Sequence, residues 1–125
     1  MMQQGLIAIF GLVGVFLRFY INGVVHNRFG TDFPGATLFI NCSGSFLIGA
    51  IYVLTYEKHI FSADIGIAIM VGLLGGFTTF SGFSLDCFQS IESGKLFYAL
   101  NYIVCSVAGG ILATYLGFAL FRKMF

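Results

Sequence analysis

Four long apolar runs dominate this sequence, and their length constrains the fold more than any other feature. A helix needs about 20 residues, at about 1.5 Å per residue, to cross the hydrocarbon of a bilayer. The runs of that length extend over residues 4–25, 33–56, 65–85 and 96–121. We therefore expect an all-α integral membrane protein with four transmembrane helices.

The composition agrees with a membrane location. Hydrophobic residues make up 58% of the chain and charged residues only 9%, and the mean hydropathy is +0.97. Such a chain has too few polar groups to cover a water-facing surface. A cleaved signal peptide would precede a soluble chain, whereas apolar segments recur here to the last residue. We expect one membrane domain over residues 1–125, with helices at about 4–27, 33–57, 63–92 and 95–122.

The short connections contain residues that favour turns and helix ends. Gly30, Pro34 and Gly94 mark the expected boundaries, and Ser62 is placed to cap the third helix, because a serine hydroxyl accepts a backbone N–H there. Small residues let helix backbones approach closely in lipid. We assign that packing role to four glycines inside the spans, Gly44, Gly49, Gly109 and Gly117.

The basic residues are divided almost evenly between the two expected faces of the membrane. An even number of spans puts both termini on one side, with Lys58, Arg122 and Lys123 there against Arg28 and Lys95, and with Arg18 near the latter end of its helix. Neither face has the excess that the positive-inside rule requires. This balance favours insertion in both orientations and an antiparallel homodimer. A single orientation with weak bias is the alternative.

Polar side chains form short stripes on otherwise apolar helices. Thr37 and Asn41 are four residues apart, as are Tyr102 and Ser106, so each pair shares one helix face. Asn41 offers N–H donors to an anion, or an ordinary interhelical hydrogen bond. The hydroxyls can also bond back to a backbone carbonyl. Arg18 either extends to the membrane interface or makes a positive vestibule that attracts an anion.

Acidic groups are scarce inside the spans. A proton-coupled exporter of cations needs an acid within the membrane, and the only candidate is Asp86, at the end of the third run. Three of the helices offer hydrogen-bond donors instead. The polar inventory therefore favours a pathway for an anion.

The segment GGFTTFSGFS, residues 75–84, lies where the third helix should cross the middle of the bilayer. Glycines and the β-branched Thr78 and Thr79 weaken a helix, so we expect a break at its centre. Hydrocarbon tolerates the freed backbone groups only beside a cavity or an ion. The carbonyls of Gly75 and Thr78 suit a small cation such as Na⁺, and Thr79 is suited to cap the helix that resumes.

Two phenylalanines follow the expected break. Phe80 and Phe83 are three residues apart and share a helix face, with Ser81 and Ser84 on a neighbouring one. Packing is the ordinary role of such a pair. The edge of an aromatic ring is positive, however, so two inward-facing edges can also hold a small anion. The spacing leaves both roles open.

These residues carry a resemblance to a known family. GGFTTFSGFS resembles the signature of the Fluc, or CrcB, fluoride channels, which is close to GGxTTFSTF. Two further motifs match, an early G-x-x-G-x-x-x-R with Gly11, Gly14 and Arg18, and a second-span G-T-L-x-x-N with Gly35, Ala36, Thr37, Leu38 and Asn41. The resemblance covers essentially the whole chain. It departs from the pattern at Gly82, at the additional Ala36, and at Gly110.

The resemblance implies a passive, highly selective channel, and not an enzyme, that exports fluoride from the cytoplasm and lowers fluoride toxicity. It implies a multi-pass protein of the plasma membrane, the inner membrane of a bacterium. Its partners are then fluoride, membrane lipid and a second, antiparallel copy with which it forms two pores, and no nucleic acid. A small dual-topology coupled transporter is the alternative.

The resemblance also implies roles for single residues. Arg18 corresponds to a vestibule arginine. The backbone carbonyls of Gly75 and Thr78, two from each chain, correspond to ligands of a structural Na⁺ at the dimer interface. The residues implied in the fluoride pore are Phe80, Phe83, Asn41, Thr37, Thr79, Ser81, Tyr102 and Ser106.

Overall fold

The computed structural model describes residues 1–30 and 34–125, and all secondary structure there is helical. The first span is α1 (Met2–Phe29), and the second is α2 (Gly35–Tyr52) continued by a π-helical segment, Val53–Glu57. The predicted start of the second helix at Phe33 lies outside the described residues. The third span contains α3 (Ala63–Ile67), a π-helical segment Ala68–Leu74, α4 (Gly75–Phe77) and α5 (Phe80–Glu92), and the fourth is α6 (Leu96–Met124).

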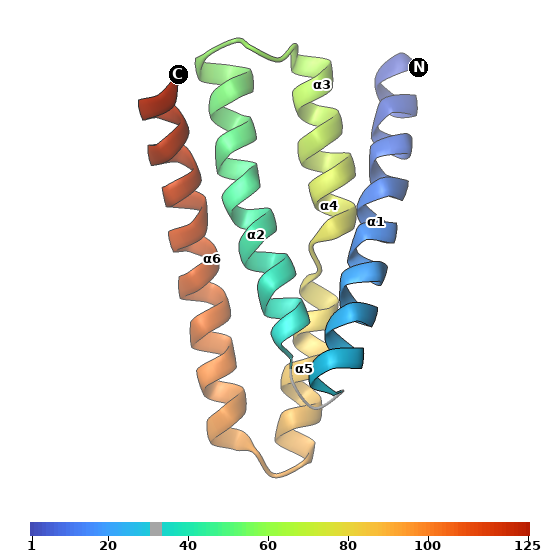
Figure 1. The fold of residues 1–125 in the computed structure, drawn as a ribbon, viewed down its shortest axis with the longest axis vertical. Coiled ribbons are helices and arrows are strands. Elements are labelled where there is room, and N and C mark those ends of the chain that lie inside the picture. Colours follow the sequence, from blue (N-terminus) through green and yellow to red (C-terminus); the bar gives the residue numbers. More distant parts are fainter. Residues whose placement is uncertain (31–33) are drawn as a thin grey trace.

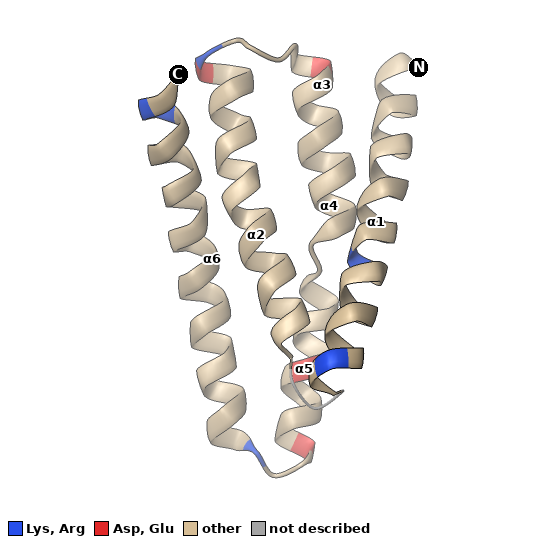
Figure 2. Cartoon of the chain, viewed as in Figure 1, with Lys and Arg blue, Asp and Glu red and all other residues tan. Residues whose placement is uncertain are grey.

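The spans form an elongated bundle with both termini at one end (Figure 1). All four spans are long and apolar enough to cross a membrane. The prediction of an all-α protein with four such helices is therefore confirmed for the described residues. Most charged residues gather at the two ends of the bundle and leave its central part almost free of charge (Figure 2). This distribution suits a chain whose centre lies in hydrocarbon.

Local signals for the helix ends are confirmed. Gly30 and Gly94 have φ angles of 81° and 76°, which side chains other than glycine rarely adopt. Ser62 caps α3, because its hydroxyl accepts the backbone N–H of Ile65 at 3.4 Å. These features depend on neighbours in sequence, and so they are readable before the fold is known.

Helices α2 and α6 pack with their backbones in close approach. A Cβ added at Gly49 would lie 2.4 Å from the carbonyl oxygen of Thr114, and one at Gly117 would lie 2.1 Å from that of Phe46. Neither position has room for a larger side chain. The packing role predicted for these two glycines is confirmed, and their contacts hold α6 against α2.

Helix α1 packs equally closely against the third span, just before α5. A Cβ at Gly14 would lie 2.1 Å from the carbonyl oxygen of Leu73, and one at Gly76 would lie 2.6 Å from that of Gly11. On the opposite side α1 exposes large apolar side chains, among them Phe16 and Phe19. Such a face is costly in water and ordinary in lipid.

An ion pair joins the second and fourth spans at the end of the bundle that holds the termini. The guanidinium of Arg122 donates to both carboxylate oxygens of Glu57, with the Nε donation at 2.8 Å, and lies 5.0 Å from the ring centroid of Phe118. Both charged groups are accessible, so the pair contributes little to stability. It links the two helix ends at this face of the bundle.

Candidate functional site

The regular helix of the third span is interrupted at Thr78 and Thr79. Helix α4 ends at Phe77 and α5 begins at Phe80, and the two threonines have extended backbone angles, with φ and ψ of −78° and 157° and of −149° and 116°. The Thr79 hydroxyl accepts the backbone N–H of Gly82 at 3.0 Å. The predicted capping of the resumed helix by Thr79 is confirmed.

Asn41 of α2 holds the extended segment by two hydrogen bonds. Its Nδ2 donates to the carbonyl oxygen of Thr79 at 3.0 Å, and its Oδ1 accepts the Thr79 N–H at 2.8 Å. The amide thus satisfies both backbone groups of a residue that lies outside any helix, which hydrocarbon would otherwise penalise. An asparagine amide has two N–H groups, and the bond to Thr79 uses one of them.

Gly44 lets α2 approach the extended segment. It lies three residues after Asn41 and therefore on the same side of α2. A Cβ at this position would lie 2.2 Å from the Cγ2 atom of Thr78. The packing role predicted for Gly44 is confirmed, and this packing is what brings the Asn41 amide within reach of Thr79.

Two backbone carbonyls beside the interruption lose their usual helical donors. In a continuous helix, Thr79 N–H would donate to Gly75 and Gly82 N–H would donate to Thr78. In this structure, these N–H groups donate to the side chains of Asn41 and Thr79 instead. Unwound carbonyl oxygens are suitable ligands for a small hard cation. The carbonyl oxygens of Gly75 and Thr78 therefore fit the Na⁺ site that the family resemblance implies.

A central hollow of about 470 Å³ opens beside the interruption, with a mainly apolar wall. Ser106 contributes an Oγ atom that is buried and has no hydrogen-bond partner among the described residues. The hollow brings together seven residues with predicted pore or cation-binding roles: Asn41, Gly75, Thr78, Thr79, Phe80, Phe83 and Ser106.

Aromatic rings line one side of this central hollow. The ring centroids of Phe80 and Phe83 are 5.6 Å apart, and those of Phe83 and Tyr102 are 5.3 Å apart. Phe80 is 78% exposed in the single chain. Contacts within the chain therefore leave most of the Phe80 ring uncovered, whereas they cover part of the Phe83 ring.

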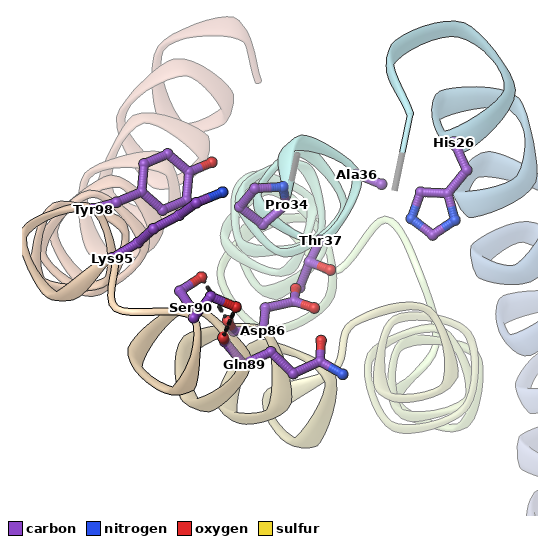
Figure 3. A pocket seen from close by; sticks show the side chains of 10 residues that line it. His26, Pro34, Ala36, Thr37, Asp86, Gln89, Ser90, Lys95 and Tyr98 are labelled. Carbon is purple, nitrogen blue, oxygen red and sulfur yellow. Dashed lines mark hydrogen bonds between the residues drawn. The ribbon is translucent and has the colours of Figure 1, made fainter. Parts of the chain in front are cut away.

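A smaller polar pocket of about 120 Å³ lies between the Pro34 end of α2 and the loop that precedes α6. Thr37 and Asp86 lie next to each other on its wall, and Lys95 stands on another side (Figure 3). The Tyr102 hydroxyl donates to Asp86 Oδ2 at 3.2 Å. Thr37 thus belongs to the polar pocket, whereas Tyr102 contacts residues of both cavities.

Three residues with predicted site roles line neither cavity: Ser81, Arg18 and Tyr102. Ser81 is exposed, and its Oγ lies 3.3 Å from the Thr79 Oγ1. Arg18 is half-buried on α1. The structure therefore collects most of the predicted site residues around the central hollow and places four outside it: Ser81, Arg18, Tyr102 and Thr37.

Asp86 is the residue whose position the sequence did not reveal. The third apolar run ends before it, although the helix expected over residues 63–92 and the observed α5 both continue past it to Glu92. Its spacing of three residues from Phe83 was the available signal, because that spacing puts both side chains on one helix face. The carboxylate lies in the polar pocket as a result.

Comparison with known proteins gives consistent results. The model of the family described as CrcB-like protein, Camphor Resistance (CrcB), matches residues 5–118. A fluoride-specific ion channel FluC of Rhizobium meliloti is 41% identical over 114 residues, which cover 91% of each chain. Another, of Citrifermentans bemidjiense, is 36% identical over 124 residues, covering 99% of this chain and 100% of the relative. FluC 1 of Methanosarcina acetivorans is 42% identical over 112 residues, covering 90% and 85%.

Proposed function

This chain belongs to the CrcB family of ion channels, which are not enzymes, and on that premise we propose that it is a passive, highly selective channel that exports fluoride from the cytoplasm. The observation that carries the proposal is the interrupted third span. Beside it, Asn41 and the phenylalanines Phe80 and Phe83 line one hollow. Among the described residues, no acidic side chain lines that hollow.

The physical properties of fluoride fit this wall. A small, strongly hydrated anion leaves water only where several donors replace its hydration shell in succession. The second N–H of Asn41, the hydroxyls of Thr79 and Ser106, and the positive ring edges are such donors. The membrane potential, negative inside, drives an anion outward at about 2.3 kcal/mol per charge per 100 mV. Export therefore needs no coupled proton and no membrane-embedded acid to carry one.

The remaining predicted residues extend this pathway. Ser81 lies next to Thr79, and Thr37 and Tyr102 continue the polar surface toward the polar pocket. Arg18 on α1 would add positive charge to a vestibule shared with a second chain. These assignments make the pathway a track of hydroxyl and amide donors.

A second, antiparallel copy would complete the channel. The central hollow is open in the single chain, and the basic residues are nearly balanced between the two ends of the bundle. One chain offers two freed carbonyls, Gly75 and Thr78, whereas a second copy would supply two more to one Na⁺. We therefore place two pores around a central Na⁺ in a homodimer of the bacterial inner membrane.

Proteoliposomes test the channel directly. Vesicles loaded with fluoride should show rapid efflux on a fluoride electrode once valinomycin and potassium compensate the charge, because a passive channel is electrogenic. Matched vesicles loaded with chloride should lose little. Slow fluoride efflux that requires an imposed proton gradient would instead support the coupled transporter.

Cross-linking tests the antiparallel dimer and its cation together. In chains without the native cysteines, Lys58→Cys and Ser93→Cys lie at opposite ends of the bundle. Co-reconstituted variants should cross-link to each other, and neither variant should cross-link to itself. Replacing Na⁺ by N-methylglucamine during preparation should lower both this yield and fluoride efflux. Self-cross-linking of either variant would show a parallel arrangement. A cross-linking yield and a fluoride efflux that do not change without Na⁺ would contradict the Na⁺ site.

A further inference from the structure

The polar pocket is connected with the central hollow through one side chain. Tyr102 donates its hydroxyl to Asp86 on the wall of the pocket, and its ring lies 5.3 Å from that of Phe83 on the wall of the hollow. The lining residues of the pocket come from the parts of α1, α2, α5 and α6 that meet at the end of the bundle opposite the termini (Figure 1). An anion that passes the rings would reach water through this pocket.

Two opposite formal charges line the pocket. Asp86 projects from α5, and Lys95 stands at the N-terminal end of α6, so with His26 neutral the formal charges of the described lining residues cancel. The described residues show no ion pair between Asp86 and Lys95, unlike Glu57 and Arg122. Lys95 therefore lines the same pocket as Asp86 without being paired with its carboxylate.

The backbone holds Lys95 in this position. Its N–H donates to the carbonyl oxygen of Ser90 at 2.9 Å, across a turn in which Gly94 has a φ of 76°. Figure 3 shows the Lys95 side chain running beside the Tyr98 ring toward the pocket. The charge is thus supplied by a defined turn and not by a freely moving loop end.

We propose that Lys95 is the countercharge of Asp86 in this pocket and thereby allows an anion to use it as the mouth of the channel. This inference rests on the proposed fluoride pathway and names a residue that controls its charge selectivity. A carboxylate alone would repel fluoride at a narrow opening, because fields between low-dielectric walls are focused. Removal of the lysine would leave that repulsion unopposed, whereas removal of both charges would restore the balance.

Fluoride efflux at low ionic strength tests the effect on conduction. Lys95→Gln should slow efflux about two- to fivefold at about 10 mM salt and much less at about 1 M, where the Debye length is only about 3 Å. Lys95→Arg should retain the wild-type rate, and Asp86→Asn combined with Lys95→Gln should recover most of it.

The charge of the pocket is measurable without any flux. Ser93 is exposed and lines the pocket, so Ser93→Cys in a chain without native cysteines reports the local potential. Lys95→Gln should lower the ratio of its modification rates by anionic and cationic thiosulfonates about two- to fivefold at low salt, and adding Asp86→Asn should restore that ratio.

The two measurements separate this inference from the proposed function. An unchanged ratio in Lys95→Gln would overturn the role of Lys95, and so would a changed ratio with unchanged efflux through a conducting channel. Wild-type vesicles that do not release fluoride would overturn the proposed function instead, and the modification ratio would still decide whether Lys95 balances Asp86.

Discussion

Replacing Asn41 with aspartate is expected to slow fluoride efflux at least about thirtyfold. The substitution removes the Nδ2 donor, and a hydrogen bond to a charged group contributes about 1.5 to 3 kcal/mol. It also puts a negative charge where the anion must pass, beside the carbonyl oxygen of Thr79 that Asn41 now satisfies. Fluoride-electrode measurements on proteoliposomes check the loss, and size-exclusion profiles in detergent check that the variant remains folded.

Asn101 provides the matched control for this change. Its Nδ2 also donates to a backbone carbonyl, that of Phe97 at 2.8 Å, but within α6 and on an exposed surface. Asn101→Asp should therefore retain most of the wild-type efflux. Equal losses in the two variants would mean that a new carboxylate harms the channel wherever it is placed. Normal efflux in a folded Asn41→Asp protein would show that Asn41 does not line the fluoride pathway.

Replacing Phe80 and Phe83 with isoleucine is the second change with a large expected effect. Isoleucine is apolar and similar enough in volume to fill most of the space, but it has no ring and hence no positive edge. Each single variant should slow fluoride efflux about tenfold if a ring contributes about 1.5 kcal/mol, the upper end for aromatic contacts. The double variant should lose more, because both rings lie on one wall of the central hollow.

Phe88 supplies the control on the same helix. It lies on α5, is 60% exposed and lines neither cavity, so Phe88→Ile should leave efflux unchanged. The comparison separates ring chemistry from packing, since a packing role would lower thermal stability and leave efflux intact. Wild-type efflux in the double variant would show that the phenylalanines only fill space.

The order and length of the helices could be predicted because lipid leaves a chain few choices. Backbone groups in hydrocarbon must be satisfied within the segment, so a long apolar run becomes a helix. The caps at Ser62 and Thr79 were also predictable, since each depends on residues within three positions of it. The π-helical segments Val53–Glu57 and Ala68–Leu74 had no such local signal.

The partners of the polar residues could not be predicted in the same way. Asn41 and Thr79 are separated by 38 positions, and their pairing needs the approach of α2 that Gly44 permits. Spacing put Thr37 and Asn41 on one face of α2, yet one lines the polar pocket and the other the central hollow. A shared helix face does not determine which neighbouring helix each side chain meets.

By itself, the sequence determined that four apolar helices are present, that hydroxyl, amide and aromatic groups gather near the middle of the chain, and which family the chain belongs to. Only the tertiary structure decided that Asn41 binds the extended Thr79 segment and that Asp86 and Lys95 line one pocket. Helix formation in lipid follows from local apolarity and backbone hydrogen bonding. Contacts between helices depend on their rotation and close approach, which are set by glycine contacts among residues far apart in the sequence.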